Sequence, residues 1–402
     1  MNKRLFFCLI IVILFSVGCH NQPDYSTPIS NPSSVLPEPI APSTSDFRVQ
    51  TGTDITPTPT EFSFKNLKQF ILDYDDDRFL CKREGSTTGT TTYFEYNIKT
   101  GEETEIVQVT DTTLGSGDII LTDDMTLFYA GAVGEDENQS SLIKVDLVNR
   151  TEETLLSFTG WPPFQYLRLI DNNTLLIFRP IRIENAETEK YCYNIERYTL
   201  DNKTKKLLVQ VPDSTKGFIS CYDYADGIIY AYHGDITEDG SAQYYIQTYD
   251  THGNPLHRYN TDDLSSHFAM SQDGEHVMQM TVFKDYFLFK TNMNIYYLLK
   301  ADANHSLNFV DLPSNGDRYL YYYPAARLTD RIGVLYDEST HTVYRYDTKE
   351  ECFVQQQVKL DVFQDYNKYI ALIKEKSDGS LFMNVKDGAD NDIDLYYILP
   401  PL

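Results

Sequence analysis

The carboxylates with the most suggestive spacing are Asp73, Asp75, Asp77 and Glu84. They fall at positions 1, 3, 5 and 12 of an EF-hand calcium loop, whose oxygen ligands suit a hard cation. However, Arg78 stands where that loop needs glycine for its sharp turn, and the residues that follow are typical of a strand. We therefore predict an acidic hairpin turn here, and we predict no metal ion or other cofactor for the chain.

Motifs that identify common enzymes are missing from the sequence. It contains no Gly-x-Ser-x-Gly elbow, no His-Glu-x-x-His pair and no phosphate-binding loop. The histidines are scattered along the chain, and His267 is the one that stands near the start of a predicted inner strand. Because residues from distant strands could still converge in space, an enzyme stays as the alternative to the main prediction, a non-catalytic protein.

The residue types point more clearly to binding than to catalysis. Two prolines restrict the backbone between the single tryptophan, Trp161, and Phe164, and several loops of the chain are acidic. An aromatic side chain held beside carboxylates suits a sugar, a basic peptide or another cationic partner. The predicted ligand-binding residues are Trp161, Phe164, Glu135, Asp136, Glu187, Asp235 and Asp239. The alternative is that the loops are charged for solubility and that Trp161 fills space between repeats.

Charge and composition exclude several classes of protein. The chain of 402 residues has 34 Lys and Arg against 59 Asp and Glu, a formal net charge of −25. Such a chain repels polyanions, so no nucleic acid is predicted as a partner. Hydrophobic residues make up 41%, with 31 Tyr and 22 Phe, which is typical of an ordered protein rich in β-strands.

The N-terminus has the pattern of an export signal. Lys3 and Arg4 precede a short apolar run and a zone of small residues before Cys19. The run is too short for a transmembrane helix, which needs about 20 residues. Small residues directly before a cysteine resemble the lipobox of bacterial lipoproteins. That resemblance implies a signal peptide at 1–18, acyl chains on Cys19 and an extracytoplasmic protein anchored to the cell membrane; ordinary secretion is the alternative.

Four cysteines remain for the exported domain: Cys81, Cys192, Cys221 and Cys352. An even number permits two disulfides. The four are far apart and lie within apolar, strand-like runs, unlike the dense frameworks of disulfide-dependent domains. We therefore favour buried free thiols.

Residues 19–60 are predicted to be a tether. Residues 20–60 contain eight Pro and thirteen Ser or Thr, with almost no periodic apolar residues. Such a segment buries too little to offset the entropy of ordering it, and its prolines favour an extended chain. The folded domain is predicted to begin at residue 61.

From residue 61 to residue 402 the chain repeats a pattern with a period close to fifty. Short β-branched and aromatic runs alternate with turn residues. One motif, a strand followed by a polar turn and a second strand, recurs. The copies of this motif are aligned at the end of their first strand, which falls at Tyr96, Val145, Tyr198, Tyr249, Leu299 and Tyr346. A unit of this length accommodates four short strands, which is one blade of a β-propeller.

The two ends of the repeat predict how the propeller closes. The last period ends within 394–399, so the seventh blade lacks its outer strand, and Phe62 and Phe64 stand where a preceding outer strand would lie. We predict an all-β, seven-bladed propeller of four-stranded blades that this N-terminal strand completes. The pattern resembles propellers of the TolB-like, WD40-like and quinoprotein-like superfamily, without the fingerprint of any one family, so the resemblance concerns the fold.

The function predicted from these features is that of a membrane-anchored lipoprotein of the cell envelope whose propeller binds a protein or glycan partner. Two alternatives stay open. One is an exported carbohydrate-active lyase or hydrolase with its site at the mouth of the propeller channel. The other is a structural subunit of a cell-envelope complex.

Overall fold

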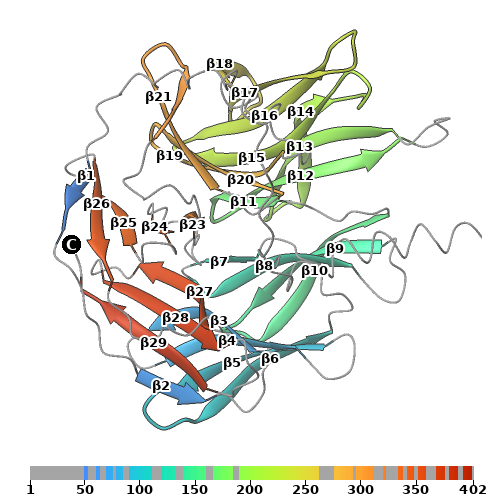
Figure 1. The fold of residues 1–402 in the computed structure, drawn as a ribbon. Helices are drawn as coiled ribbons and strands as arrows, with labels where there is room; N and C mark the ends of the chain where they lie inside the picture. The colour runs from blue at the N-terminus through green and yellow to red at the C-terminus, as the bar shows by residue number, and fades with distance from the viewer. Residues whose placement is uncertain are drawn as a thin grey trace, which may run out of the picture. The chain divides into compact units, whose positions relative to one another are not determined.

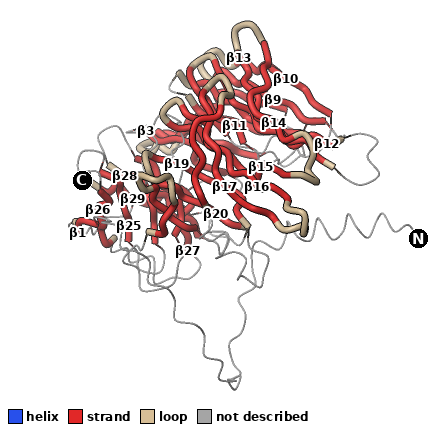
Figure 2. The backbone as a smooth tube through the Cα atoms, turned by 90° about the horizontal axis from the view of Figure 1, so that it is seen from above, coloured by secondary structure: helices blue, strands red, loops and turns tan. Residues whose placement is uncertain are grey.

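A computed structural model describes the folded part of the chain. The described residues are 49–52, 60–63, 69–75, 78–84, 90–110, 119–122, 124–132, 139–159, 166–183, 190–261, 276–292, 296–310, 320–322, 334–337, 342–347, 352–358, 368–375, 380–387 and 393–400. All of them belong to one compact unit, Ser43–Leu402. Their regular structure consists of β-strands, as Figure 2 shows. No helix among these residues is long and apolar enough to cross a membrane.

Five four-stranded sheets are built from strands that follow one another in the chain, each antiparallel to its neighbour (Figure 1). Sheet 1 contains β3 (Gln69–Asp75), β4 (Arg78–Glu84), β5 (Thr90–Asn97) and β6 (Glu103–Thr110); sheet 2 contains β7 (Ile119–Leu121), β8 (Thr126–Ala132), β9 (Gln139–Asp146) and β10 (Thr151–Thr159). Sheet 3 contains β11 (Tyr166–Asp171), β12 (Thr174–Arg182), β13 (Tyr191–Thr199) and β14 (Thr204–Val211). Sheet 4 contains β15 (Gly217–Ala225), β16 (Ile228–Ile236), β17 (Ala242–Asp250) and β18 (Pro255–Asn260); sheet 5 contains β19 (Val277–Phe283), β20 (Tyr286–Thr291), β21 (Tyr296–Ala301) and β22 (Leu307–Phe309).

Two further sheets combine C-terminal strands with a strand from the N-terminal part of the chain. Sheet 6 contains β23 (Leu320–Tyr322), β24 (Val334–Asp337), β25 (Thr342–Asp347), β26 (Cys352–Gln357) and, on its outer edge, β1 (Val49–Thr51). Sheet 7 contains β27 (Lys368–Glu375), β28 (Leu381–Asp387), β29 (Ile393–Leu399) and, as its fourth strand, β2 (Thr60–Ser63).

The predicted N-terminal closure is present. Strand β2 runs antiparallel to β29, with Phe62 opposite Asp394. Phe64 lies outside the described residues. Strand β1 was not expected, because Val49–Thr51 falls inside the segment predicted to be a tether, yet it pairs in parallel with β26. Strands β3 and β4, on either side of the predicted acidic turn, pair antiparallel with Asp75 opposite Arg78, while Asp77 lies outside the described residues.

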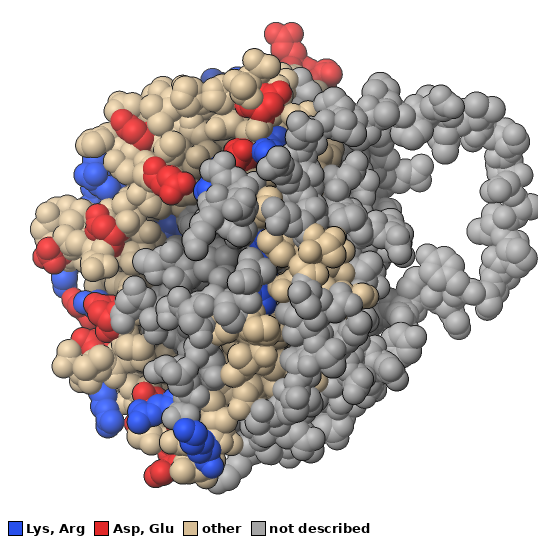
Figure 3. Space-filling model, turned by 90° about the vertical axis from the view of Figure 1, so that its left-hand side faces the viewer, with Lys and Arg blue, Asp and Glu red and all other residues tan. Residues whose placement is uncertain are grey.

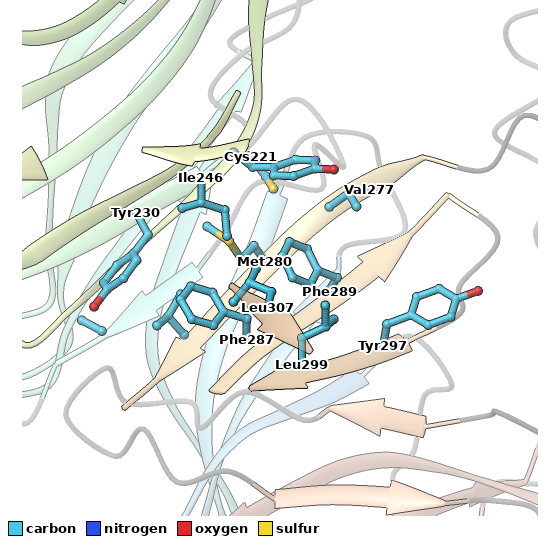
Figure 4. Close-up of a cluster of buried hydrophobic side chains, with 13 residues drawn as sticks. Cys221, Tyr230, Ile246, Val277, Met280, Phe287, Phe289, Tyr297, Leu299 and Leu307 are labelled. Atoms are coloured by element: carbon cyan, nitrogen blue, oxygen red, sulfur yellow. The ribbon is translucent and has the colours of Figure 1, made fainter. Parts of the chain in front are cut away.

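Aromatic and aliphatic side chains pack between neighbouring sheets. Clusters of buried residues join six pairs of sheets: 1 and 2 (Leu80, Ile143), 2 and 3 (Leu142, Leu167), 3 and 4 (Phe178, Tyr222), 4 and 5 (Tyr230, Phe287), 5 and 6 (Tyr286, Phe353), and 7 and 1 (Phe382, Phe79). Figure 4 shows the cluster between sheets 4 and 5. Arg345 of sheet 6 donates to the carbonyl oxygen of Pro400, directly after β29, at 2.8 Å.

The first strands of sheets 1, 2, 3, 4, 5 and 7 lie on the inner side of the fold. Contacts join β7 to β11, β11 to β15, β15 to β19 and β27 to β3, which are all first strands of adjacent sheets. Sheets that pack face to face in chain order, with the last against the first, form a β-propeller. The chain therefore has this fold.

The turns between third and fourth strands explain why the strand–turn–strand motif recurs in the sequence. An Asn or Asp at the end of a third strand, or directly after it, accepts backbone N–H groups of the turn, as at Asn97, Asp146, Asp250 and Asp302. Each turn then passes through a residue at positive φ: Gly101, Arg150, Lys203, Gly253 and His305. This side-chain capping is a local preference, so it recurs with the same period as the sheets.

Candidate functional site

Hydrogen bonds join three segments on one face of sheets 3 and 4. The connection from β14 to β15 donates from the Ser214 N–H to the Tyr191 carbonyl at 2.9 Å, at the base of the β12–β13 hairpin. The same connection accepts the Ile236 N–H at the Lys216 carbonyl at 3.0 Å, at the end of β16. The two hairpins and the connection therefore share a surface, which we call the loop face.

Asp235 is exposed on this face near the end of β16. Its carboxylate Oδ1 accepts the hydroxyl of Tyr245, on β17, at 3.1 Å. Burial, with the nearby Asp235 charge adding to it, raises the pKa of Tyr245 to about 12, so this hydroxyl stays protonated and keeps donating at neutral pH. Asp235 is therefore held in a fixed position while its second oxygen is left for another donor.

Asp239 lies in the loop between β16 and β17 and is also exposed. Its Oδ1 accepts the Thr237 hydroxyl, the Ser241 hydroxyl at 2.8 Å and the Ser241 N–H at 3.1 Å. These bonds, that from Thr237 first, lower the pKa of Asp239 to about 2. Gly240 has a φ of +83°, which the tight turn requires. The loop thus presents a second ordered carboxylate, charged at any physiological pH.

A stack of side chains supports Asp235 from behind. The ring of His233 lies parallel to that of Tyr245, with 5.2 Å between centroids, and the Arg258 guanidinium carbon is 3.6 Å from the centroid of the Tyr245 ring. The His233 Nε2 is 3.0 Å from the Tyr249 hydroxyl. Burial lowers the pKa of His233 to about 4, so it is neutral at pH 7. The stack fixes Tyr245, which in turn positions Asp235.

Two of the predicted ligand-binding residues, Asp235 and Asp239, are exposed on the same β16–β17 hairpin. The other five (Trp161, Phe164, Glu135, Asp136 and Glu187), together with Cys19 and His267, lie outside the described residues. Sequence reasoning missed His233, Tyr245 and Arg258. The signal for two of them was present, because the β16–β17 hairpin places His233 opposite Tyr245.

The inner strands carry a different polar group. Arg168 of β11 donates from Nε to Asp223 Oδ1 at 2.8 Å, and Asp223 Oδ2 accepts the Val282 N–H of β19 at 2.8 Å. One carboxylate on β15 thus ties three consecutive sheets together. Within the described part of the chain, no group of three or more His, Cys, Asp or Glu side chains could hold a metal ion.

Acidic and basic side chains are interspersed on the described part of the face in Figure 3. None of the four cysteines of the folded domain forms a disulfide, which agrees with the prediction of thiols. Cys81, Cys221 and Cys352 are buried as predicted, but Cys192 is partly exposed. Burial raises the pKa of the Cys221 thiol, which is therefore not ionised at neutral pH.

Comparisons with known proteins give distant matches to solved structures. No family model and no curated protein matches the chain. An oligogalacturonate lyase in complex with manganese is 13% identical with a TM-score of 0.47, over 88% of this chain and 98% of that one. The oligogalacturonate lyase of Vibrio parahaemolyticus is 12% identical with a TM-score of 0.46, over 88% and 99%.

A third match is the β-propeller domain of the trilobed protease from Pyrococcus furiosus. It is 11% identical with a TM-score of 0.45, over 80% of this chain and 89% of that one. Identities and TM-scores this low support no conclusion about the family or the activity of this protein. The propeller assignment for this protein therefore stands on its own sheet order, its N-terminal closure and the packing between its sheets.

Proposed function

We propose that this protein is an extracytoplasmic, lipid-anchored lipoprotein whose propeller binds a protein or glycan partner through the loop face. The observation that carries the binding role is the pair of exposed carboxylates, Asp235 and Asp239, each held by hydrogen bonds within one hairpin. Ordered carboxylates lose little side-chain entropy on binding. Their negative charge and acceptor oxygens favour cationic groups or sugar hydroxyls as partners.

The proposed location is supported by the N-terminal pattern alone. A charged start, a short apolar run and small residues before Cys19 suit export followed by acylation. Each buried CH₂ of an acyl chain contributes about 0.8 kcal/mol of membrane affinity, so two or more chains would hold the protein at the membrane without a transmembrane helix.

The test is recovery of partners from detergent-solubilised membranes with the full chain as bait. Asp235→Asn and Asp239→Asn combined should reduce recovery of specific partners about tenfold, because both charges of the hairpin are lost. When cells are fractionated before detergent is added, the Cys19→Ala chain should move from the membrane fraction to the soluble fraction.

Asp226→Asn is the matched control. Asp226 is also exposed in sheet 4, but in the turn between β15 and β16 at the other end of β16, and asparagine tolerates its φ of +51°. Equal recovery by the double variant and by the unmutated chain would reject the loop face as the binding surface. Treating the membranes with a glycosidase or with a protease distinguishes a glycan partner from a protein partner.

A further inference from the structure

The propeller already binds one extra strand, at the outer edge of sheet 6. Strand β1 lies parallel to β26, with Val49 opposite Phe353 and Thr51 opposite Gln355. The Gly52 N–H donates to the Gln355 carbonyl at 2.7 Å. A fifth strand is present in this sheet alone among those the structure describes. In Figure 1 it lies beside β26.

The edge that β1 covers differs in composition from the other outer strands. Strand β26 reads Cys-Phe-Val-Gln-Gln-Gln and contains neither a charged residue nor proline. Every other described outer strand of more than three residues, β2, β6, β10, β14 and β18, carries at least one charged residue. Charges and prolines are what normally prevent edge strands from pairing between molecules. Uncharged, glutamine-rich segments pair readily with identical copies.

The contact that holds β1 is short and specific. A Cβ atom added to Gly52 would lie 2.8 Å from Gln356 Cγ and 3.1 Å from Val354 Cγ1, so only glycine approaches β26 this closely. The paired segment is three residues long, and each backbone hydrogen bond contributes about 1 kcal/mol. A segment held this weakly opens on its own, unlike the strands of the core.

We propose that the outer edge of β26 is a strand-addition site, that residues 49–52 fill it within the same chain, and that a second copy of the chain pairs with it when this segment is withdrawn. The occupant of the open edge is the identical β26 edge of another molecule, because two uncharged copies of this strand meet without charge repulsion. The N-terminal segment therefore prevents self-association by covering the edge of β26.

Gly52→Pro in the full chain tests the proposal. The substitution removes the N–H donor and places a ring where there is no room for a Cβ, and it leaves the core untouched. Amide hydrogen exchange at the N–H groups of β26 that point toward β1 should become at least tenfold faster in dilute protein. Sedimentation velocity should show dimers and larger species as the concentration rises. Thr51→Ala is the matched control, because the exposed Thr51 side chain is lost while the backbone pairing stays.

Two additions separate edge pairing from general unfolding. A peptide with the sequence of residues 47–53 should restore slow exchange and suppress association of the Gly52→Pro chain. Adding Gln357→Lys, at an exposed position of β26, should abolish association without slowing exchange. Unchanged amide exchange of β26 in Gly52→Pro would show that the segment does not cover this edge. Fast exchange with a constant mass at all concentrations would show that the edge does not pair with itself.

Discussion

At the scale of single residues, the neutral imidazole of His233 is the most informative group. It is 5% exposed, and its ring is fixed between Tyr245 and Tyr249. Asp235 favours the charged form, yet burial outweighs it and lowers the pKa of His233 to about 4. The proton must therefore stay off this side chain for the stack behind the loop face to persist.

This lowered pKa predicts a pH dependence of stability. In the unfolded chain the imidazole has a pKa of about 6.5, so below that pH the unfolded state binds a proton that the folded state refuses. Stability should be complete above pH 6.5 and fall toward pH 4, by about 2 kcal/mol between pH 7 and pH 5. Urea unfolding at the two pH values measures this loss, which His233→Gln should remove and His252→Gln, at an exposed turn, should retain. The same loss in His233→Gln would contradict the assignment.

At the scale of elements, the turns between third and fourth strands both define the repeat and support the packing of neighbouring sheets. The turn after β17 contacts β14 of the preceding sheet: a Cβ on Gly253 would lie 2.5 Å from the Leu208 carbonyl oxygen. Arg197 also reaches this turn, donating to the Thr251 carbonyl at 3.5 Å. Gly253 has a φ of +92°, so glycine meets two requirements at this position.

Gly253→Ala should therefore lower the free energy of unfolding by about 2–3 kcal/mol, from backbone strain and from the clash with Leu208 together. Gly240→Ala provides the comparison. Gly240 has a similar φ of +83° but no atom within 4 Å of an added Cβ, so only the strain applies, about 1 kcal/mol. Chemical denaturation of both variants measures the difference. Equal losses would mean that the close approach to Leu208 does not matter.

At the scale of the whole molecule, two N-terminal strands pair with C-terminal ones, and β2 is the one that closes the propeller. Strand β2 completes sheet 7, and the Phe79, Phe382 and Tyr396 rings then pack between sheets 7 and 1, with centroids 5.4 Å and 5.6 Å from Phe79. Because this junction is the closure of the fold, it is made by residues more than 300 positions apart.

Truncation separates the roles of the two strands. A chain that begins at residue 57 lacks β1, and one that begins at residue 65 lacks both strands. The shorter chain should lose a further 2–4 kcal/mol or so of unfolding free energy, since about one kcal/mol is lost with each ladder hydrogen bond. It should also show faster amide exchange at the N–H groups of β29 that point toward β2. Equal stability of the two truncated chains would show that β2 does not close the propeller.

How much of the structure could be predicted follows from the range of each interaction. The strands and their period near fifty were predictable, because β-branched runs and Asn or Asp turn caps such as Asn97 and Asp250 act over a few residues. The closure by β2 was predictable from the period, because the last repeat lacks its outer strand. The hairpin carrying Asp235 and Asp239 was predictable for the same reason, since local turn chemistry sets its register.

Tertiary structure alone decided the features that join distant segments. Residues 47–51 read Phe-Arg-Val-Gln-Thr, a short alternating run without proline, but nothing in it indicates which edge it joins. Its pairing with β26 uses backbone groups that every residue has. The hydrogen bonds that join Arg168 through Asp223 to β19 form only when separate sheets meet. The burial that keeps His233 neutral also requires the folded chain, because the rings of Tyr245 and Tyr249 lie against it there. The sequence by itself therefore determined the strands and their period, because local chemistry specifies them, and the strand missing from the last period indicated the closing strand. The contacts between sheets followed from packing, which depends on the whole chain at once.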